Sequence, residues 1–199
     1  MLAHFLDRKL LILGLGTLLI GTVMSQLITP LSIYAVDFMG MSAAKLGFLF
    51  SINGAVVVLF QIPLAHWGQG KKLSVFLWGG SIFYALGYGY LSLAAGFGFA
   101  AAAVAGVTLG EIAVSPAMNA VAANLAGEET KGAYLGFVRF ARQMGWAIGP
   151  VIGGWGLAFW GRLRPCPYWM LIGACALAAA VVYRSLGLRL SAREEGQLI

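Results

Sequence analysis

The chain has 199 residues, of which 60% are hydrophobic and 10% are charged, and its formal net charge is +6. Charged residues make up roughly a quarter of an ordinary soluble domain, so this composition excludes a soluble globular protein and indicates a membrane protein. The positive charge does not indicate a nucleic-acid partner, because no basic patch is interleaved with aromatic residues on a soluble surface.

The hydrophobic residues occur in six runs of about 18 to 29 residues, each long enough to cross a hydrocarbon layer about 30 Å thick as a helix. The breaks between the runs contain turn-forming and charged residues, such as AGEETKG at 126–132. The polar tail SAREEGQLI at 191–199 is too short to fold alone. We therefore expect one all-α transmembrane domain over residues 1–199, with spans at about 10–35, 46–66, 73–94, 97–125, 132–158 and 166–183.

Lysine and arginine are distributed unevenly between the two ends of these spans. With both termini in the cytoplasm, the residues on or toward the inner side are Arg8, Lys9, Lys71, Lys72, Lys131, Arg139, Arg142, Arg184, Arg189 and Arg193. Only Lys45, Arg162 and Arg164 remain outside. Because cytoplasmic loops are enriched in lysine and arginine, we expect a multi-pass protein of the plasma (inner) membrane with cytoplasmic termini and a cytoplasmic tail at 184–199.

The first two runs contain a few polar side chains. The first run is about 26 residues long and lacks a cleavage site, so it is not a cleaved signal peptide. Gln26 precedes Pro30 and lies eight positions before Tyr34, on roughly the same helix face. These two side chains are substrate-contact candidates, although a tyrosine near a helix end is equally typical of the membrane interface. Asn53 and Gln61 in the second run either line a cavity or form interhelical hydrogen bonds, and we favour the hydrogen bonds.

The fourth run contains one glutamate, Glu111, in the stretch TLGEIAVSPAMNA at 108–120. A helix places Glu111 near the bilayer midplane, where a charge costs several kcal/mol unless it is paired, protonated or hydrated. Ser115 and Asn119 follow at steps of four, on the same helix face. This polar stripe is expected to face protein or water and to be part of a substrate or proton pathway.

Two arginines of the fifth run are expected near Glu111. Consecutive spans are antiparallel, and with the turn at residue 128 the offset between Glu111 and Arg142 is about 4.5 Å of helix rise. Arg139 lies farther toward the turn. We expect a Glu111–Arg142 ion pair. A tight pair would keep the carboxylate charged and indicate a structural role, whereas a desolvated carboxyl group that exchanges a proton would couple transport to protons. The residues alone support both alternatives equally.

The fifth run also contains the glycine-rich stretch MGWAIGPVIGGWG at 144–156. Gly145, Gly149 and Gly153 recur every four residues, so they share one face on which a neighbouring backbone can approach closely. Pro150 lacks a backbone N–H and favours a kink. The pattern predicts a helix that packs tightly and bends.

Catalytic and metal-binding patterns do not occur. Cys166 and Cys175 lie nine positions apart, about 13 Å along a helix, which is too far for a disulfide. His4 and His66 lack the spacing of a metal site. The chain has no Walker-type loop, HExxH motif or serine-histidine-acid set, so we expect no enzyme activity, metal or cofactor.

A short internal repeat relates two of the runs. Residues 46–48 read LGF near the start of the second run, and residues 135–137 read LGF near the start of the fifth. Pro63 and Pro150 follow at similar distances. Because three spans separate the copies, the second is upside down relative to the first, as in the 3+3 inverted repeats of secondary transporters.

Together these motifs resemble the major facilitator superfamily. The glycine-proline motif GxxxGPxxGG of that family is matched by Gly145, Gly149, Pro150, Gly153 and Gly154. TLGEIAVSP at 108–116, KGAYLGF at 131–137 and FSINGAVVVLFQIPLAHW at 50–67 follow the same pattern in the right order. The chain looks like the six-helix carboxy-terminal half of a multidrug/proton antiporter. The resemblance implies secondary active transport, with proton-coupled efflux of a drug-like or metabolite molecule.

One loop departs from the family pattern. The segment LAHWGQGKK at 64–72 lies at the position of the signature loop, but His66 and Trp67 occupy its acidic and basic positions. The glycine and positive charges of the loop remain at Gly70, Lys71 and Lys72. The gating salt bridge of the complete loop is therefore not expected here.

Length is the larger departure, because the family pattern needs two six-helix halves around a cavity. Either an amino-terminal half is missing from this sequence or a second six-helix chain completes the pathway. We favour the missing half, because MLAHFLDRK at 1–9 resembles the end of a central linker. The expected partners are the lipid bilayer, a small-molecule substrate and protons. A passive channel or facilitator, and a non-transporting fragment or scaffold, are the alternatives.

Overall fold

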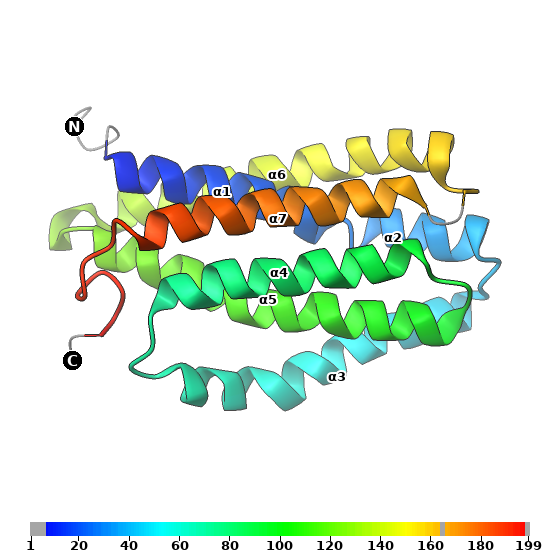
Figure 1. The fold of residues 1–199 in the computed structure, drawn as a ribbon, viewed down its shortest axis with the longest axis horizontal. Coiled ribbons are helices and arrows are strands. Elements are labelled where there is room, and N and C mark those ends of the chain that lie inside the picture. Colours follow the sequence, from blue (N-terminus) through cyan, green and yellow to red (C-terminus); the bar gives the residue numbers. More distant parts are fainter. Residues whose placement is uncertain (1–6, 164–165, 198–199) are drawn as a thin grey trace.

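The computed structural model describes residues 7–163 and 166–197, and these residues form helices and turns without strands. The helices in chain order are α1 (Arg8–Ser25), α2 (Thr29–Ile33), the π-helix η2 (Tyr34–Phe38), α3 (Ala43–Gly68), α4 (Leu73–Ser92), α5 (Phe97–Leu125), the 3₁₀-helix η3 (Glu128–Thr130), α6 (Lys131–Trp160) and α7 (Pro167–Gly187). The long helices run along the longest axis of the molecule (Figure 1).

The helices follow the six ranges expected from the sequence. By length and composition, four helical stretches among the described residues suit a membrane span: Arg8–Phe38, Ala43–Gly68, Phe97–Leu125 and Pro167–Gly187. The remaining two, α4 and α6, have 20 and 30 residues. Glycine, serine and tyrosine lower the hydropathy of α4, as Arg139 and Arg142 lower that of α6. Arg142 is partly buried in the bundle, whereas Arg139 is exposed on this six-helix unit.

Six membrane crossings place both ends of the chain on the same side of the bilayer, and the connections between the helices agree with this arrangement. The start of α1, the α3–α4 turn, the α5–α6 turn and the segment after α7 all lie at one end of the bundle (Figure 1). Lys71, Lys72 and Lys131 belong to this end. The clustering of basic residues predicted from the sequence is therefore compatible with the fold, while the cytoplasmic placement of this end stays a prediction.

The first predicted run is not one continuous helix, because residues 26–28 form a turn between α1 and α2. Pro30 has no backbone N–H to donate, and the next amide, that of Leu31, donates to the Gln26 carbonyl at 3.0 Å. The chain then passes into the π-helix at Tyr34. The spacing argument for a shared face of Gln26 and Tyr34 assumed a uniform helix, and the turn at residues 26–28 removes that basis.

The glycine face of α6 packs directly on the first part of the chain. A Cβ atom added at Gly145 would collide with the backbone of α1, one at Gly149 with Ser25, and one at Gly153 with Pro30. The predicted close-packing seam is therefore present between α1 and α6. Helix α6 continues through Pro150 without interruption, so a kink there stays a prediction.

A buried aromatic cluster joins the first span to α4 and α7. The Trp169 ring lies edge-on to Tyr34, with ring centroids 5.3 Å apart, and stacks on Tyr88 at 5.5 Å. The Tyr168 ring contacts Trp169 at 5.0 Å, and the Tyr88 hydroxyl donates to the Val23 carbonyl at 3.0 Å. The residues of this cluster come from three separate spans, so no local sequence pattern predicts their contacts.

Helix α3 is the least buried of the long helices. Its principal neighbour is α5, and Leu49 is the one fully buried residue among its 26, all of which the structure describes. Its outer face is apolar, with Val58 and Ile62 exposed by 76% and 65%. In a bilayer this surface has to meet lipid or another protein segment.

The tail after α7 folds back onto the bundle and forms a clasp, residues 191–196. Glu195 is 2% exposed, and its carboxylate accepts hydrogen bonds from the Ser74 amide at 2.9 Å and the Ser74 hydroxyl at 2.5 Å. The Glu194 carboxylate lies 2.7 Å from the Lys9 ammonium, and the Glu194 carbonyl accepts from the Asn124 side chain at 3.2 Å. The clasp therefore caps the start of α4 and joins it to α1 and α5.

Protonation of Glu194 destabilises the packing of the clasp on the bundle. Partial burial alone would raise its pKa, but hydrogen bonds from Lys9 and Ser191 and the charge of Lys9 outweigh burial and hold the pKa below the ordinary glutamate value. A carboxyl group with a lowered folded-state pKa stabilises the fold above its unfolded-state pKa, and this stabilisation is lost as pH falls through the folded-state value.

We predict that Gly145→Val lowers the free energy of unfolding by about 1–3 kcal/mol, because the added carbons have no space against α1. The matched control is Gly154→Val, in the same helix, where an added Cβ meets no atom within 4 Å. Denaturant titration of both variants in detergent measures the difference. Equal stabilities would contradict the packing seam.

We predict that Glu195→Ala lowers the free energy of unfolding by about 1–3 kcal/mol, because the buried Ser74 amide and hydroxyl lose their acceptor. The comparison variant is Glu128→Ala, which removes an exposed carboxylate paired with Lys131. Thermal unfolding should distinguish the two, with Glu128→Ala unchanged. A Glu195→Ala variant as stable as the parent would show that the clasp contributes nothing.

We predict that the tail detaches on acidification as Glu194 becomes protonated. A dye attached at Gln197→Cys should lose fluorescence anisotropy as pH falls below the ordinary glutamate range. With Lys9→Gln added, the loss should begin at higher pH, because the cation that lowers the Glu194 pKa is gone. The same midpoint with and without Lys9 would exclude this ion pair as the cause.

Candidate functional site

Three helices, α1, α5 and α6, surround a cavity of about 310 Å³ that contains the only glutamate of the α5 span. Its lining residues are Met24, Glu111, Ser115, Arg142, Gln143 and Trp146. Glu111 is half-buried, and Gln143 is exposed, so the cavity reaches the surface of the six-helix unit. The site brings together a carboxyl group, a guanidinium group, a hydroxyl group, an amide and an aromatic ring.

Glu111 and Arg142 lie at the same level of the bundle, as expected, but the predicted ion pair between them is not formed. Within the part of the chain that the structure describes, the ion pairs of 4.0 Å or less are Lys9–Glu194 and Lys131–Glu128. Counting residues from the turn gives the position of each side chain along its helix axis. It does not give the direction in which the side chain points or the distance between the helices. Helix α6 packs mainly against α1 and much less against α5, which leaves the cavity between the two groups.

The predicted stripe on α5 is only partly at the site. Ser115 lines the cavity, whereas Asn119 does not and instead donates a hydrogen bond from its amide to the Ser115 carbonyl at 3.1 Å. Arg139 is exposed and lies one turn nearer the α5–α6 turn, outside the cavity lining. The cavity is therefore shorter than the stripe.

Asn53 approaches Glu111 from α3. The Asn53 amide donates to the Thr108 hydroxyl at 2.8 Å, and that hydroxyl donates to the Val104 carbonyl at 2.7 Å. The Asn53 side chain also interacts with the Glu111 carboxyl group. Asn53 thus forms an interhelical hydrogen bond, the role favoured from the sequence, at the position where α3 passes the glutamate. Gln61 lies elsewhere, in a groove between α3 and α5.

The two candidates from the first run lie apart from the Glu111 cavity. Gln26 is fully buried, its amide nitrogen donates to the Thr22 carbonyl at 2.7 Å, and its amide oxygen accepts a hydrogen bond from the Tyr168 hydroxyl. Tyr34 belongs to the aromatic cluster. Gln26 therefore connects the end of α1 to α7, and neither residue lines the site.

Sequence reasoning missed three lining residues. Trp146 follows Arg142 by four positions, so it shares a helix face with the arginine, and this spacing was available as a signal. Gln143 is adjacent to Arg142. Met24 comes from α1, and nothing in its local sequence indicates which part of α5 it faces.

The remnant of the signature loop forms a tight turn between α3 and α4. Gly70 has a φ of +71°, a conformation that favours glycine. The Lys71 ammonium lies 3.0 Å from the centroid of the Trp67 ring, and Lys72 directly precedes α4. Neither lysine belongs to the two ion pairs that the described residues form.

No group of three or more histidine, cysteine or acidic side chains that could hold a metal ion occurs within residues 7–163 and 166–197. Two residues considered in the sequence, His4 and Arg164, lie outside the described residues.

Comparison with known proteins gives consistent matches over nearly the whole chain. The family model described as Major Facilitator Superfamily matches residues 4–197. An MFS-type transporter of Bacillus subtilis, YttB, is 33% identical over 150 residues, which are 73% of this chain and 37% of the relative. The multidrug resistance protein MdtH of Salmonella arizonae is 25% identical over 169 residues, covering 83% of this chain and 41% of the relative.

A solved structure shares the fold. A bacterial homologue of the human lysosomal transporter Spinster, in an inward-facing and unoccupied conformation, superposes with a TM-score of 0.77 at 18% identity. The superposition covers 90% of this chain and 42% of that structure. The chain thus spans about two-fifths of the length of the curated relatives it matches.

Proposed function

This chain belongs to the major facilitator superfamily, a family of membrane transporters and not of enzymes, and we propose that it is the carboxy-terminal half of a secondary active transporter. The proposed reaction is the export of a drug-like or metabolite molecule in exchange for protons. The similarity to MdtH, a multidrug resistance protein, supports this substrate class. The all-α, six-helix architecture supports a half with the 3+3 inverted repeat of the superfamily.

A second six-helix half is part of this proposal. It comes either from a missing amino-terminal part of a longer chain or from a second chain. The Glu111 cavity reaches the surface of the present unit through Gln143, so an opposing half would close it. Large apolar side chains that follow Gln143 in α6 are exposed, including Val151 at 62% and Trp155 at 70%. Rocking of one half against the other would then expose the cavity to alternate sides.

The observation that carries the proposal is the environment of Glu111. The carboxyl group sits in the middle of a 29-residue helix, half-buried and beside a cavity. Ion pairing with Arg142 was the main reason for a structural interpretation, and the two groups lie across the cavity without such a pair. An ionisable group at this depth that is not tied by an ion pair favours a functional role.

The other lining residues have distinct proposed roles. Asn53 holds α3 against α5 beside the carboxyl group. Because α6 packs mainly on α1, a shift of α1 and α6 relative to α5 would move the Arg142 guanidinium toward or away from Glu111. Approach of a cation favours proton release from a carboxyl group, and withdrawal favours proton binding. Trp146 and Met24 supply an apolar wall for the organic part of a substrate.

The proposed orientation follows the distribution of basic residues. We place the end that bears Lys71, Lys72 and Lys131 in the cytoplasm, with both chain termini on the same side of the plasma membrane.

We predict that Glu111→Gln abolishes the gradient-dependent part of transport in the complete two-half transporter, because an amide cannot exchange a proton in this pH range. Proteoliposomes with an imposed pH gradient and a fluorescent lipophilic dye measure it, with and without a protonophore. Glu128→Gln, on the exposed α5–α6 turn, is the matched control and should transport as the parent does.

Four results would contradict the proposal. Dye flux that is independent of the gradient in the parent protein would indicate a passive channel or facilitator, and no saturable flux would indicate a non-transporting scaffold. Unchanged coupling in a normally folded Glu111→Gln protein would assign the proton to another group. Loss of folding in that variant would support the structural role.

A further inference from the structure

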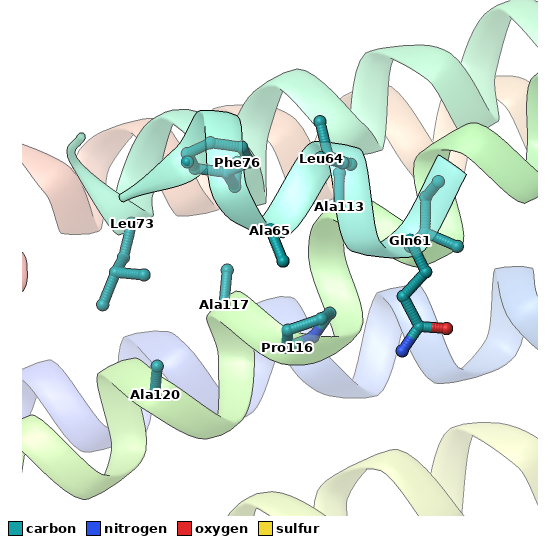
Figure 2. Close-up of a pocket in the computed structure, with 11 residues that line it drawn as sticks. Gln61, Leu64, Ala65, Leu73, Phe76, Ala113, Pro116, Ala117 and Ala120 are labelled. Atoms are coloured by element: carbon teal, nitrogen blue, oxygen red, sulfur yellow. The ribbon is translucent and has the colours of Figure 1, made fainter. Parts of the chain in front are cut away.

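A second cavity, separate from the Glu111 site, lies between α3, α4 and α5. It is a groove of about 300 Å³, and its lining residues are Gln61, Leu64, Ala65, Gly68, Leu73, Phe76, Ile112, Ala113, Pro116, Ala117 and Ala120. Figure 2 shows α3 on one side of the groove and α5 on the other, with Phe76 and Leu73 at one end. Gln61, the one polar side chain in this lining, lies toward the opposite end. The groove between them is apolar.

A cationic and aromatic cluster stands where the groove meets the α3–α4 turn. The Trp67 ring, in the last turn of α3, lies edge-on to Phe76 with ring centroids 5.9 Å apart. The Lys71 ammonium lies 3.0 Å from the Trp67 ring centroid, and Lys72 is exposed next to it in the chain. Phe76 belongs to both the groove lining and this cluster, so the charged cluster is continuous with the apolar groove.

The depth of the cluster matches a membrane surface. Helix α3 has 26 residues, about 39 Å of helix, which exceeds the roughly 30 Å hydrocarbon core. Its two ends therefore lie in the interfacial layers, where tryptophan and lysine are enriched. The groove runs from this level along α3 toward Gln61, about two turns deeper.

Among the described residues, neither Lys71 nor Lys72 forms an ion pair of 4.0 Å or less, although the Glu195 carboxylate binds Ser74 two positions after Lys72. The ion pairs of the described residues use Lys9 and Lys131, and they occupy Glu194 and Glu128. Lys71 and Lys72 are in neither pair. Two positive charges above an apolar groove at the bilayer surface are complementary to a molecule with an anionic headgroup and a hydrocarbon chain.

We propose that this groove binds an anionic phospholipid, with one acyl chain between α3 and α5 and the phosphate beside Lys71 and Lys72. The Trp67 ring lies at the level of the glycerol and ester groups, as interfacial tryptophans do. The site rests on the membrane location of the chain and is independent of the transport chemistry at Glu111. The proposal gives a lipid-binding role to the α3–α4 turn, in which His66 and Trp67 occupy the acidic and basic positions of the family's signature loop.

The test uses the purified protein in phosphatidylcholine vesicles with a trace of phosphatidylglycerol that carries a photoactivatable diazirine in one acyl chain. After illumination, the labelled peptides are mapped by mass spectrometry. Labelling should concentrate in segments 61–76 and 112–120. Excess unlabelled phosphatidylglycerol should compete, whereas the same amount of added phosphatidylcholine should not.

Two variants separate the headgroup from the chain. K71Q/K72Q should reduce groove labelling by roughly fivefold for each lysine removed. The control K45Q, at the other end of α3, should leave it unchanged. Ala120→Phe should fill the groove and remove the labelling while both lysines remain. Circular dichroism and thermal unfolding identify any variant that fails to fold, in which case K71Q/K72Q, on the exposed turn, decides the matter.

Four outcomes would overturn the proposal. They are equal labelling by a diazirine-bearing phosphatidylcholine, labelling unaffected by K71Q/K72Q, labels spread over all lipid-facing helices, and, in the complete two-half transporter, loss of groove labelling with protein–protein cross-links to the other half. The last result would identify a protein segment as the occupant of the groove.

Discussion

The structure depends on one constraint, that a polar group inside a bilayer has no water to bind and must find its partner within the protein. Helices satisfy this constraint for the backbone, and hydroxyl groups in the spans donate to carbonyls one turn earlier, as Thr108 does to Val104. At the break beside Pro30, the Leu31 amide and the Gln26 side chain take up the hydrogen bonds that a continuous helix would have made. Polar residues of the spans are therefore mostly structural, which makes the half-buried Glu111 stand out.

The same constraint shapes how the helices associate. Lipid is as apolar as leucine, so close contact between helices relies on small residues and on shape. The glycine face of α6 lies against α1 in this way, and the aromatic cluster around Trp169 joins the first span to α4 and α7. Helix α3 has such contacts only at its carboxy-terminal end, where Trp67 and Gly68 meet Phe76. It rests mainly on α5 through contacts that include the Asn53–Thr108 hydrogen bond. The Glu111 cavity and the α3–α5 groove lie on different sides of α5, the first toward α6 and the second toward α3.

The two cavities differ in the chemistry they offer, and this difference supports different roles. The first presents a carboxyl group, a guanidinium group and an aromatic wall, the features of a site that recognises a small polar or charged molecule. The second is lined by apolar side chains apart from Gln61 and lies beside the Lys71–Trp67 cluster. Both sites use α5, so the helix that contains Glu111 is also the one around which the proposed functions are arranged.

The sequence by itself determined the membrane class, the positions of the helices within a few residues, the superfamily and the importance of the glycine face, because run length and helical period are local properties of the chain. It also located Glu111 and Arg142 at one level, since depth follows from counting residues. Only the tertiary structure decided that these two groups face a cavity without pairing, that Met24 completes its lining, and that Gln26 binds Tyr168. It alone decided that Glu195 caps α4. Each of these contacts joins residues far apart in the chain, and rotation of a helix about its axis and the spacing between helices are set by packing, which no local pattern encodes.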